Sequence, residues 1–178
     1  MEQRAAVIEV RAAGRRLEGW AALFGVEASV SDPARGTFRE RIRPGAFAAS
    51  IGGDVLALRD HDPRRVLGRT TSGTLRLREE ARGLAFELDV PDTSEGRDTL
   101  VMAERGDLGG CSIGFTVNPG GEEWRGDLRE LRTVSLAEIS IVSAWPAYRG
   151  TVVQCRSGLY EPRQRLSAAR LWLNTVGT

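Results

Sequence analysis

Residues 75–90 read LRLREEARGLAFELDV and carry the clearest strand pattern of the chain. Leu75 and Leu77 alternate with arginines, and a second run from Leu84 to Val90 alternates large apolar residues with Ala, Glu and Asp. A period of two puts the apolar side chains on one face of a strand and the polar ones on the other. The glycine-containing EEARG between the two runs supplies a turn. This stretch therefore predicts a β-hairpin with one face directed toward a core.

Shorter strands and a few helices are predicted on both sides of the hairpin. Strands are expected over residues 7–11, 17–24, 55–58, 111–117 and 124–143. Residues 26–37 are rich in turn formers and are expected to be a loop. Helices are expected over residues 46–51 and 92–105, the second with a capping residue in its first positions and Gly106 at its end.

The balance of these elements predicts the fold class. Strands outnumber helices, and turn residues recur throughout, which is typical of a mainly β fold with some α structure. We expect an antiparallel β-barrel of about six to seven strands, surrounded by a few helices. A chain of 178 residues suffices for one domain with a substantial core. Because the composition changes after residue 155, we expect a domain over 1–155 and a basic helix or tail over 156–178.

Composition excludes several classes of function. A net charge of +1 gives no basic excess for nucleic acid, and no apolar run approaches the ~20 residues that span a bilayer. All 25 basic residues are arginine, which excludes lysine-based catalysis. The N-terminal stretch has no long apolar core, so no secretory signal is expected. We therefore expect a cytosolic protein in which Cys111 and Cys155 are reduced.

Ser112 is the first residue with the potential for chemistry. In the predicted strand CSIGFTV (111–117), Cys111 lies on the apolar face, and Ser112 points to the other face between Gly110 and Gly114. Such small neighbours leave room for another molecule to approach the hydroxyl. The alternative is an ordinary solvent-facing serine, with glycines where another backbone comes close.

Glu138 and His61 complete a possible constellation. Glu138 lies in a predicted strand that is apolar on both faces, so its carboxylate needs a partner, either an arginine or an imidazole. His61 is the only histidine and lies in RDHDPRRVLG (59–68), which is otherwise typical of a charged surface turn. A serine nucleophile needs a base, and if Ser112 is one, His61 has no competitor for that role.

A metal site is not expected from these residues. Asp60, His61 and Asp62 are adjacent, and successive residues of a strand point in opposite directions. The sequence has no second histidine and no closely spaced cysteine pair to complete a zinc shell. No cofactor is predicted.

Three ordered blocks resemble one family. The central block spans residues 58–115, from LRDHDPRRVLG to GGCSIGF. The upstream block is FRERIRPGAFAASI (38–51), and the downstream block is LAEISIVSAWPAY (136–148). Together they resemble the tailed-phage prohead (capsid maturation) proteases over about residues 15–153. The resemblance implies a β-barrel surrounded by helices, similar to herpesvirus assemblin. It also implies a serine endopeptidase that cuts scaffold and major capsid protein inside the immature capsid, in the host cytoplasm.

Carried over by block, the resemblance assigns His61 as base, Ser112 as nucleophile and Glu138 as acidic third member. Asp60 or Asp62 could replace Glu138 as the residue that orients the imidazole. The oxyanion donors could come from Gly109 and Gly110 or from a nearby arginine. Cys111 stands where family members commonly carry another residue type, and SAWPAYRGTVV (143–153) matches only a general proline-containing turn.

Several alternatives remain at this stage. The chain could be an inactive capsid or scaffold component with the same fold, or the equivalent protease of a gene transfer agent. A remote alternative is a hydrolase with Cys111 as nucleophile, against which the apolar face of that residue argues. The sequence leaves open whether the chain forms a homo-oligomer.

Overall fold

The computed structural model describes residues 1–6 and 10–143, which hold thirteen strands and one helix. The helix is α1 (Ser94–Arg105). The strands are β1 (Glu2–Ala6), β2 (Val10–Ala13), β3 (Arg16–Leu23), β4 (Ala28–Asp32), β5 (Gly36–Ile42), β6 (Leu56–Arg59), β7 (Asp62–Arg69), β8 (Leu75–Glu80), β9 (Gly83–Asp89), β10 (Gly110–Val117), β11 (Glu122–Arg125), β12 (Leu128–Leu131) and β13 (Val134–Val142). The helix or tail predicted over 156–178 and Cys155 lie outside the described residues. None of the described helical structure is long and apolar enough to cross a membrane.

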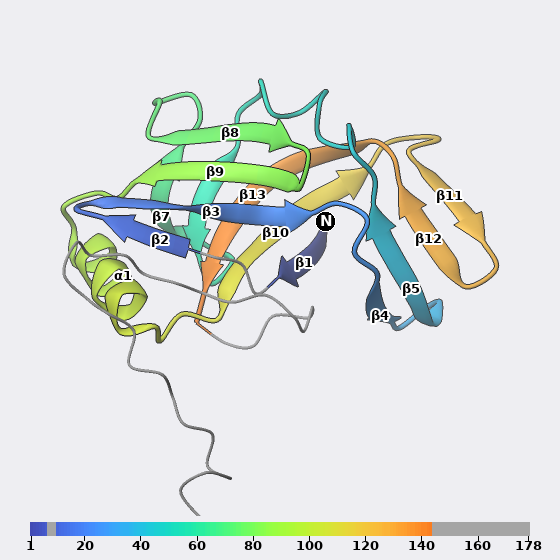
Figure 1. Cartoon of the computed structure of the whole chain (residues 1–178), viewed down its shortest axis with the longest axis horizontal. Helices are drawn as coiled ribbons and strands as arrows, with labels where there is room; N and C mark the ends of the chain where they lie inside the picture. Colours follow the sequence, from blue (N-terminus) through green and yellow to red (C-terminus); the bar gives the residue numbers. More distant parts are fainter. Residues whose placement is uncertain (7–9, 144–178) are drawn as a thin grey trace, which may run out of the picture.

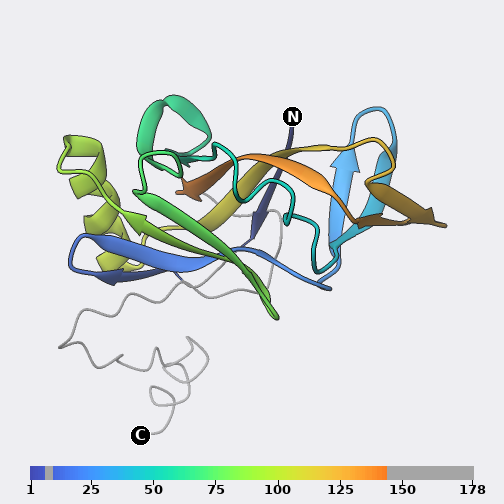
Figure 2. The ribbon, with the colours of Figure 1, turned by 90° about the horizontal axis from the view of Figure 1, so that it is seen from above.

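The strands form three sheets. The five-stranded sheet has the order β1-β10-β13-β6-β7, and a four-stranded sheet with the order β2-β3-β9-β8 faces it. The third sheet, β11-β12-β5-β4, lies at one end of the molecule, opposite α1 (Figure 1). Seen from above, β10 and β13 run together through the length of the five-stranded sheet (Figure 2).

The predicted hairpin and the predicted second helix are confirmed. β8 and β9 pair antiparallel, with Leu75 opposite Leu88. Helix α1 is capped by Thr93, whose side chain accepts a hydrogen bond from the Gly96 N–H at 3.2 Å. It ends at Gly106, which has the left-handed conformation (φ 74°) that favours glycine at a helix C-terminus.

The predicted closed antiparallel barrel is not confirmed. The mainly β composition is correct, but each of the three sheets is open and has two edge strands. Two strand pairs are parallel, β5 with β12 and β6 with β13. The described residues also hold thirteen strands instead of six to seven, and one helix instead of several. Alternation reveals that a segment is a strand and which face is apolar, but it does not reveal the partner strand or whether a sheet closes.

Two local predictions were wrong. Residues 46–51 form successive turns, with hydrogen bonds such as Ser50 N–H to Phe47 O at 2.8 Å, and no α-helix. The segment is held by burial, because Ala46 and Phe47 are fully inaccessible to solvent. The predicted loop 26–37 contains β4 and the start of β5. β4 reads ASVSD, in which small and polar residues mask the strand pattern.

One hydrophobic core fills the space between the five-stranded sheet and the β2-β3-β9-β8 sheet. The hairpin contributes the apolar face predicted for it, and β10 and β13 contribute their inward faces from the opposite side. The fully or almost fully buried members include Leu75, Leu84, Phe86, Leu88, Cys111, Ile113, Phe115, Ile139 and Ile141. The two sheets therefore stabilise each other through a shared core, and the strands that carry the candidate site form one wall of it.

Close packing of β3 on β9 leaves no room for a side chain at Gly83. A Cβ atom at this position would lie 2.1 Å from Ala22 O and 3.0 Å from Leu23 Cα, both of which belong to backbone. We expect Gly83→Ala to destabilise the fold by about 1–3 kcal/mol, because the strands must separate to relieve the overlap. Denaturant-induced unfolding measures the change. Gly52→Ala, where nothing lies within 4 Å of the added atom, is the matched control. Equal stability of both variants would contradict this description of the β3–β9 contact.

Candidate active site

Ser112 lies in β10, between β1 and β13. It pairs with Ala5 of β1 on one side and with Ser140 of β13 on the other. The side chain is almost fully buried, and its Oγ makes no hydrogen bond within residues 1–6 and 10–143. A buried hydroxyl without a partner costs ~1–3 kcal/mol, and such groups are rare in native proteins. The described fold does not use this hydroxyl structurally.

Glu138 lies diagonally across the strand pair from Ser112, on the same face of the sheet. It is opposite Gly114, two residues from Ser140 on β13. A Cβ on Gly114 would lie 2.6 Å from Glu138 Cγ and 2.9 Å from its Oε1. The glycine that the sequence places beside Ser112 therefore makes room for the Glu138 side chain. Diagonal neighbours across such a pair have Cα atoms roughly 7–8 Å apart.

A β-bulge directs Glu138 to this face. The sequence alternation predicts that Val134, Leu136 and Glu138 share one face of their strand. The register of β13 shifts between Gly114 and Phe115, so that Leu136 instead pairs with Phe115 and both join the core. The predicted shared face is therefore wrong, because one extra residue in β13 reverses the alternation. That same shift explains why the strand looks apolar on both faces in the sequence.

His61 is presented by a two-residue hairpin loop between β6 and β7. Asp60 and His61 have φ angles of 51° and 60°, so both adopt the left-handed conformation that such tight hairpins require. The imidazole reaches back to β13, where Nδ1 forms a short contact with Glu138 Oε1. Ser140 Oγ also donates to Glu138 Oε1, at 3.4 Å. In the described part of the chain, no arginine forms a salt bridge with Glu138.

The contact with Glu138 defines the protonation pattern of the imidazole. A carboxylate only accepts hydrogen bonds, so Nδ1 carries the proton. In the neutral ring this leaves the lone pair on Nε2, the atom that can act as a base. The structure thus brings His61 and Glu138 into contact and places Ser112 on the neighbouring strand. It records no hydrogen bond between Ser112 Oγ and the imidazole.

The two aspartates beside His61 are bound elsewhere. Asp60 accepts a hydrogen bond from the Ser143 N–H at 2.7 Å and another from Arg65 at 3.1 Å. Asp62 binds Arg64 through both oxygens, at 3.0 and 2.9 Å. Hydrogen bonds from the Arg64 side chain and backbone lower the pKa of Asp62 to about 2. Neither aspartate is available as the carboxylate partner of the imidazole.

The Gly109–Gly110 segment is only partly free to serve as an oxyanion site. The Gly109 N–H donates to Val142 O at 2.8 Å, so this amide is already part of the sheet. Gly110, at the start of β10, has a φ of 146° that favours glycine. A role for the Gly110 backbone stays a prediction. The described residues contain no group of three His, Cys, Asp or Glu side chains suited to a metal ion.

A comparison with known families identifies the family of the chain. Residues 4–164 match the family described as Caudovirus prohead serine protease. The chain belongs to this family. The match covers most of the 178 residues and includes all three blocks that the sequence resemblance rests on. No curated protein and no solved structure matches the chain, so the expected likeness to herpesvirus assemblin stays a prediction.

Cys111 has the environment of a core residue. It is fully buried on the face of β10 opposite to Ser112, and burial raises the pKa of its thiol to about 12. Since the thiolate is the nucleophilic form, a thiol that stays protonated at neutral pH is unreactive. This environment argues against Cys111 as the nucleophile of a prohead protease.

Ser140 was missed by sequence reasoning. It is fully buried, faces Ser112 across the strand pair and donates to Glu138. Its position two residues after Glu138 would have placed it on the same face of a strand. Because serine is common on the polar faces of strands, nothing else in LAEIS distinguishes it.

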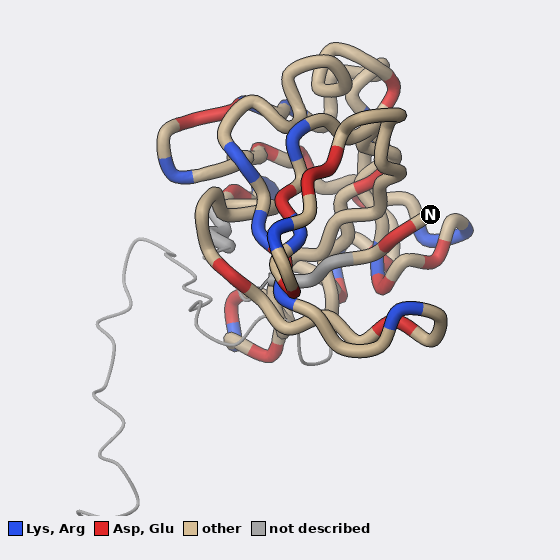
Figure 3. The backbone as a smooth tube through the Cα atoms, turned by 90° about the vertical axis from the view of Figure 1, so that its right-hand side faces the viewer, with Lys and Arg blue, Asp and Glu red and all other residues tan. Residues whose placement is uncertain are grey.

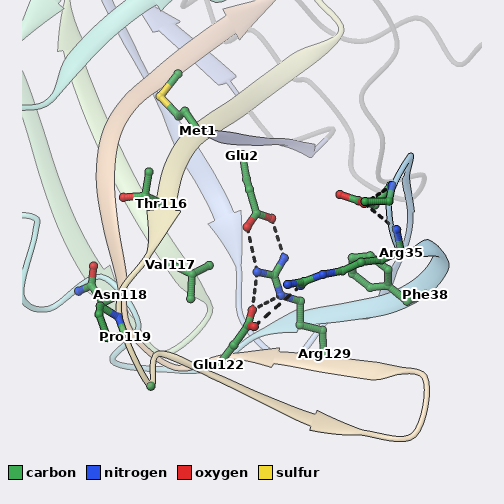
Figure 4. A pocket seen from close by; sticks show the side chains of 13 residues that line it. Met1, Glu2, Arg35, Phe38, Thr116, Val117, Asn118, Pro119, Glu122 and Arg129 are labelled. Carbon is green, nitrogen blue, oxygen red and sulfur yellow. Dashed lines mark hydrogen bonds and ion pairs between the residues drawn. The ribbon is translucent and has the colours of Figure 1, made fainter.

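A second polar cluster lies at the far end of β10. Arg129 binds Glu2 at 2.6 and 2.8 Å, Glu40 at 2.9 Å and Glu122 at 2.6 Å, beside a hollow of about 560 Å³ (Figure 4). Burial disfavours its charged form, yet the hydrogen bonds that Arg129 donates to Glu2 and Glu122 hold its pKa above its usual value. This cluster connects β1 to the third sheet.

Acidic and basic residues alternate along the backbone on the side of the molecule seen in Figure 3, without a large region of one charge.

Gly114→Ala tests whether the space at Gly114 positions Glu138. The added methyl group overlaps Glu138 Cγ and Oε1, so we expect the carboxylate to rotate away from His61. His61 is the only histidine, so its imidazole gives a single set of NMR signals in ¹⁵N-labelled protein. These signals should move in Gly114→Ala and stay in place in Thr116→Ala, an exposed position on the same strand. Unmoved signals in Gly114→Ala would show that the glycine has no such role.

Alkylation tests the state of Cys111. We expect iodoacetamide at pH 8 to leave Cys111 of the native protein unmodified, because the thiol is buried and protonated. After unfolding, its pKa returns to about 8.5 and it should react. Mass spectrometry of the tryptic peptide 106–125 measures the modification of Cys111 in the native and in the unfolded protein. Rapid modification of the native protein, with loss of proteolysis, would restore Cys111 as a candidate nucleophile.

Proposed function

We propose that the chain is a serine endopeptidase in which Ser112 is the nucleophile, His61 the general base and Glu138 the residue that orients the imidazole. The observation that carries this proposal is the contact between His61 Nδ1 and Glu138 Oε1, on the sheet face where Ser112 is buried without a hydrogen-bond partner. Membership of the prohead serine protease family supports the same reaction class.

The proposed reaction follows the serine–histidine mechanism. His61 Nε2 takes the hydroxyl proton as Ser112 Oγ attacks the peptide carbonyl, and the tetrahedral intermediate then expels the amine, which receives that proton. Water releases the acyl group in a second, similar step. Glu138 stabilises the imidazolium that forms in both steps. The Ser112–His61 hydrogen bond forms when substrate binds, since such contacts often tighten only in the enzyme–substrate complex.

The intermediate also needs hydrogen-bond donors for its oxyanion. The backbone N–H of Gly110 is the proposed donor, because the Gly109 N–H is bound to Val142 O. A nearby arginine is the alternative source. Loss of one such donor commonly lowers the rate by ~10²–10³.

The proposed substrates are the scaffold and major capsid proteins of an immature phage capsid, inside the host bacterial cytoplasm. Enzyme and substrate enclosed in one shell meet at high effective concentration, so weak affinity suffices. The proposal involves no nucleic acid, membrane or cofactor. The equivalent protease of a gene transfer agent would act in the same way, and the neighbouring genes distinguish the two. Self-association is compatible with either.

An inactive capsid component with the same fold is the competing proposal. Such a protein would have no need of a partly buried imidazole–carboxylate contact beside a buried, unpartnered hydroxyl. The unpartnered hydroxyl lowers the stability of the fold, so a protein without the activity would have no reason to retain it. The arrangement therefore favours the enzyme over the inactive component.

Coexpression with the neighbouring major capsid protein tests the proposed roles. Ser112→Ala and His61→Ala should abolish processing, since loss of either member commonly lowers kcat by ~10⁶. Glu138→Gln should retain more activity, because the neutral amide still contacts the ring but stabilises the imidazolium less. Electrophoretic mobility of the capsid protein measures all three. Ser29→Ala, an exposed serine on β4, is the control and should process normally.

Two outcomes would contradict the proposal. Full processing by Ser112→Ala or His61→Ala would exclude the mechanism. Full processing by Glu138→Gln alone would reduce Glu138 to a structural partner of His61.

A further inference from the structure

The loop that presents His61 has an unusual backbone. Asp60 and His61 are the only non-glycine residues with positive φ within residues 1–6 and 10–143. The left-handed conformation is unfavourable for most side chains, although aspartate and asparagine tolerate it better than others. Residues held in such conformations cost of order 1–3 kcal/mol each and persist only where the surroundings fix them. Something around this loop must therefore hold it.

Asp60 makes the contacts that hold the loop. Its backbone N–H donates to Ile141 O at 3.0 Å. Its Oδ1 accepts the Ser143 N–H at 2.7 Å, and its Oδ2 accepts the Ser143 hydroxyl at 3.0 Å. Ile141 is near the end of β13 and Ser143 directly follows it. The loop is thus bound at three points to the strand that carries Glu138.

Arginines on both sides of Asp60 support this attachment. Arg59 is almost fully buried and donates to Ile141 O at 3.0 Å and, in a short contact, to Ser143 Oγ. Arg65 donates to Asp60 Oδ2 at 3.1 Å and to both oxygens of Glu95 at 3.0 and 2.6 Å. Glu95 lies in the first turn of α1, so the helix is connected to the loop through Arg65.

We propose that Asp60 is a positioning residue that clamps the His61 loop to the end of β13 and thereby keeps the imidazole against Glu138. This inference rests on the proposed function of His61. His61 and Glu138 lie on separate segments. β6 pairs with β13 as far as Arg59, and beyond that point the loop is joined to β13 by the Asp60 contacts, by the Arg59 side chain and by the imidazole–carboxylate contact itself. Without the clamp, residues 60 and 61 keep, among the described residues, the Asp60 N–H bond and the imidazole contact as their own links to β13, and the ring can move away from the carboxylate.

The clamp is directed away from the reacting groups. Both Asp60 oxygens are bound by Ser143 and Arg65, so the side chain has no contact with the imidazole. Burial disfavours its charge, but the Ser143 N–H and the nearby Arg59 hold the pKa of Asp60 below its usual value. Asp60 therefore stays charged, and acts through His61 without contact with substrate.

The neighbouring aspartate provides a matched control. Asp62 is also adjacent to His61 and is also bound by an arginine, but within residues 1–6 and 10–143 its carboxylate is hydrogen-bonded to Arg64 alone, two residues away. Asp60→Asn retains size and tolerance of positive φ, and it removes the charge and one acceptor oxygen. Asp62→Asn makes the same chemical change without touching β13. A difference between these variants therefore reports on the clamp and not on the charge near His61.

A fluorophosphonate reagent measures the reactivity of Ser112 without a known substrate. Ser112 Oγ forms a bond to phosphorus and displaces fluoride, while His61 takes the proton. We expect Asp60→Asn to lower the maximal rate of labelling roughly 10- to 100-fold with an unchanged half-saturating concentration, since small misplacements of a catalytic group have effects of this size. Asp62→Asn should label like wild type. Ser143→Ala removes the hydroxyl contacts with Asp60 and Arg59 but keeps the Ser143 N–H bond to Asp60, so it should give a smaller loss. Combining it with Asp60→Asn should add little to the Asp60→Asn loss.

NMR of the single histidine separates positioning from general destabilisation. The imidazole signals should shift or broaden in Asp60→Asn and remain in place in Asp62→Asn, while the backbone spectrum of both stays folded. Wild-type labelling rates in Asp60→Asn, or equal losses in both variants, would overturn the inference. Failure of wild-type protein to label at Ser112 would instead overturn the proposed function, so the two failures are distinguishable.

Discussion

The antiparallel pairing of β10 with β13 is the constraint on which the rest of this structure depends. It lies in the middle of the five-stranded sheet, and both faces of the pair are buried around Ser112. On one face Ile113 and Ile139 pack into the core, and on the other Ser112 and Glu138 lie together, where Glu138 contacts His61. A slip of one residue would exchange these faces. The register that builds the core is therefore the register that assembles the site.

Local features of the fold could be predicted because they depend on neighbouring residues. The β8–β9 hairpin and α1 follow from periodicity and caps that lie within 20 residues of each other. The partners of β5 and β6 could not be predicted, because their parallel pairing joins segments about 80–90 residues apart that carry no matching local pattern. The bulge in β13 was invisible for a related reason, since it is defined by the register with β10 and not by the sequence of β13 alone.

The candidate site likewise contains residues that the sequence indicates and one that it does not single out. His61 stood out because it is the only histidine, and Ser112 because small residues surround it. The carboxylate was harder, since Asp60 and Asp62 are adjacent to His61, whereas Glu138 is 77 residues away. Proximity in sequence was misleading, because the tight loop directs the imidazole toward β13 and arginines bind both aspartates. The arginine partners of both aspartates stay charged at any physiological pH. These ion pairs therefore persist over that pH range.

The placement of β1 limits the direction from which a peptide can arrive. A strand has two hydrogen-bonding edges, and those of β10 are occupied by β13 and by β1, with Ala5 directly opposite Ser112. While β1 is in place, an extended peptide has no free main-chain edge beside the serine on which to add as a further strand. In the proposed protease, a peptide would then have to reach Ser112 from the sheet face that Ser112 shares with Glu138. If the proposed activity holds, residues 2–6 exclude strand addition on this side of Ser112, and side-chain contacts on the sheet face would select the bond to be cut.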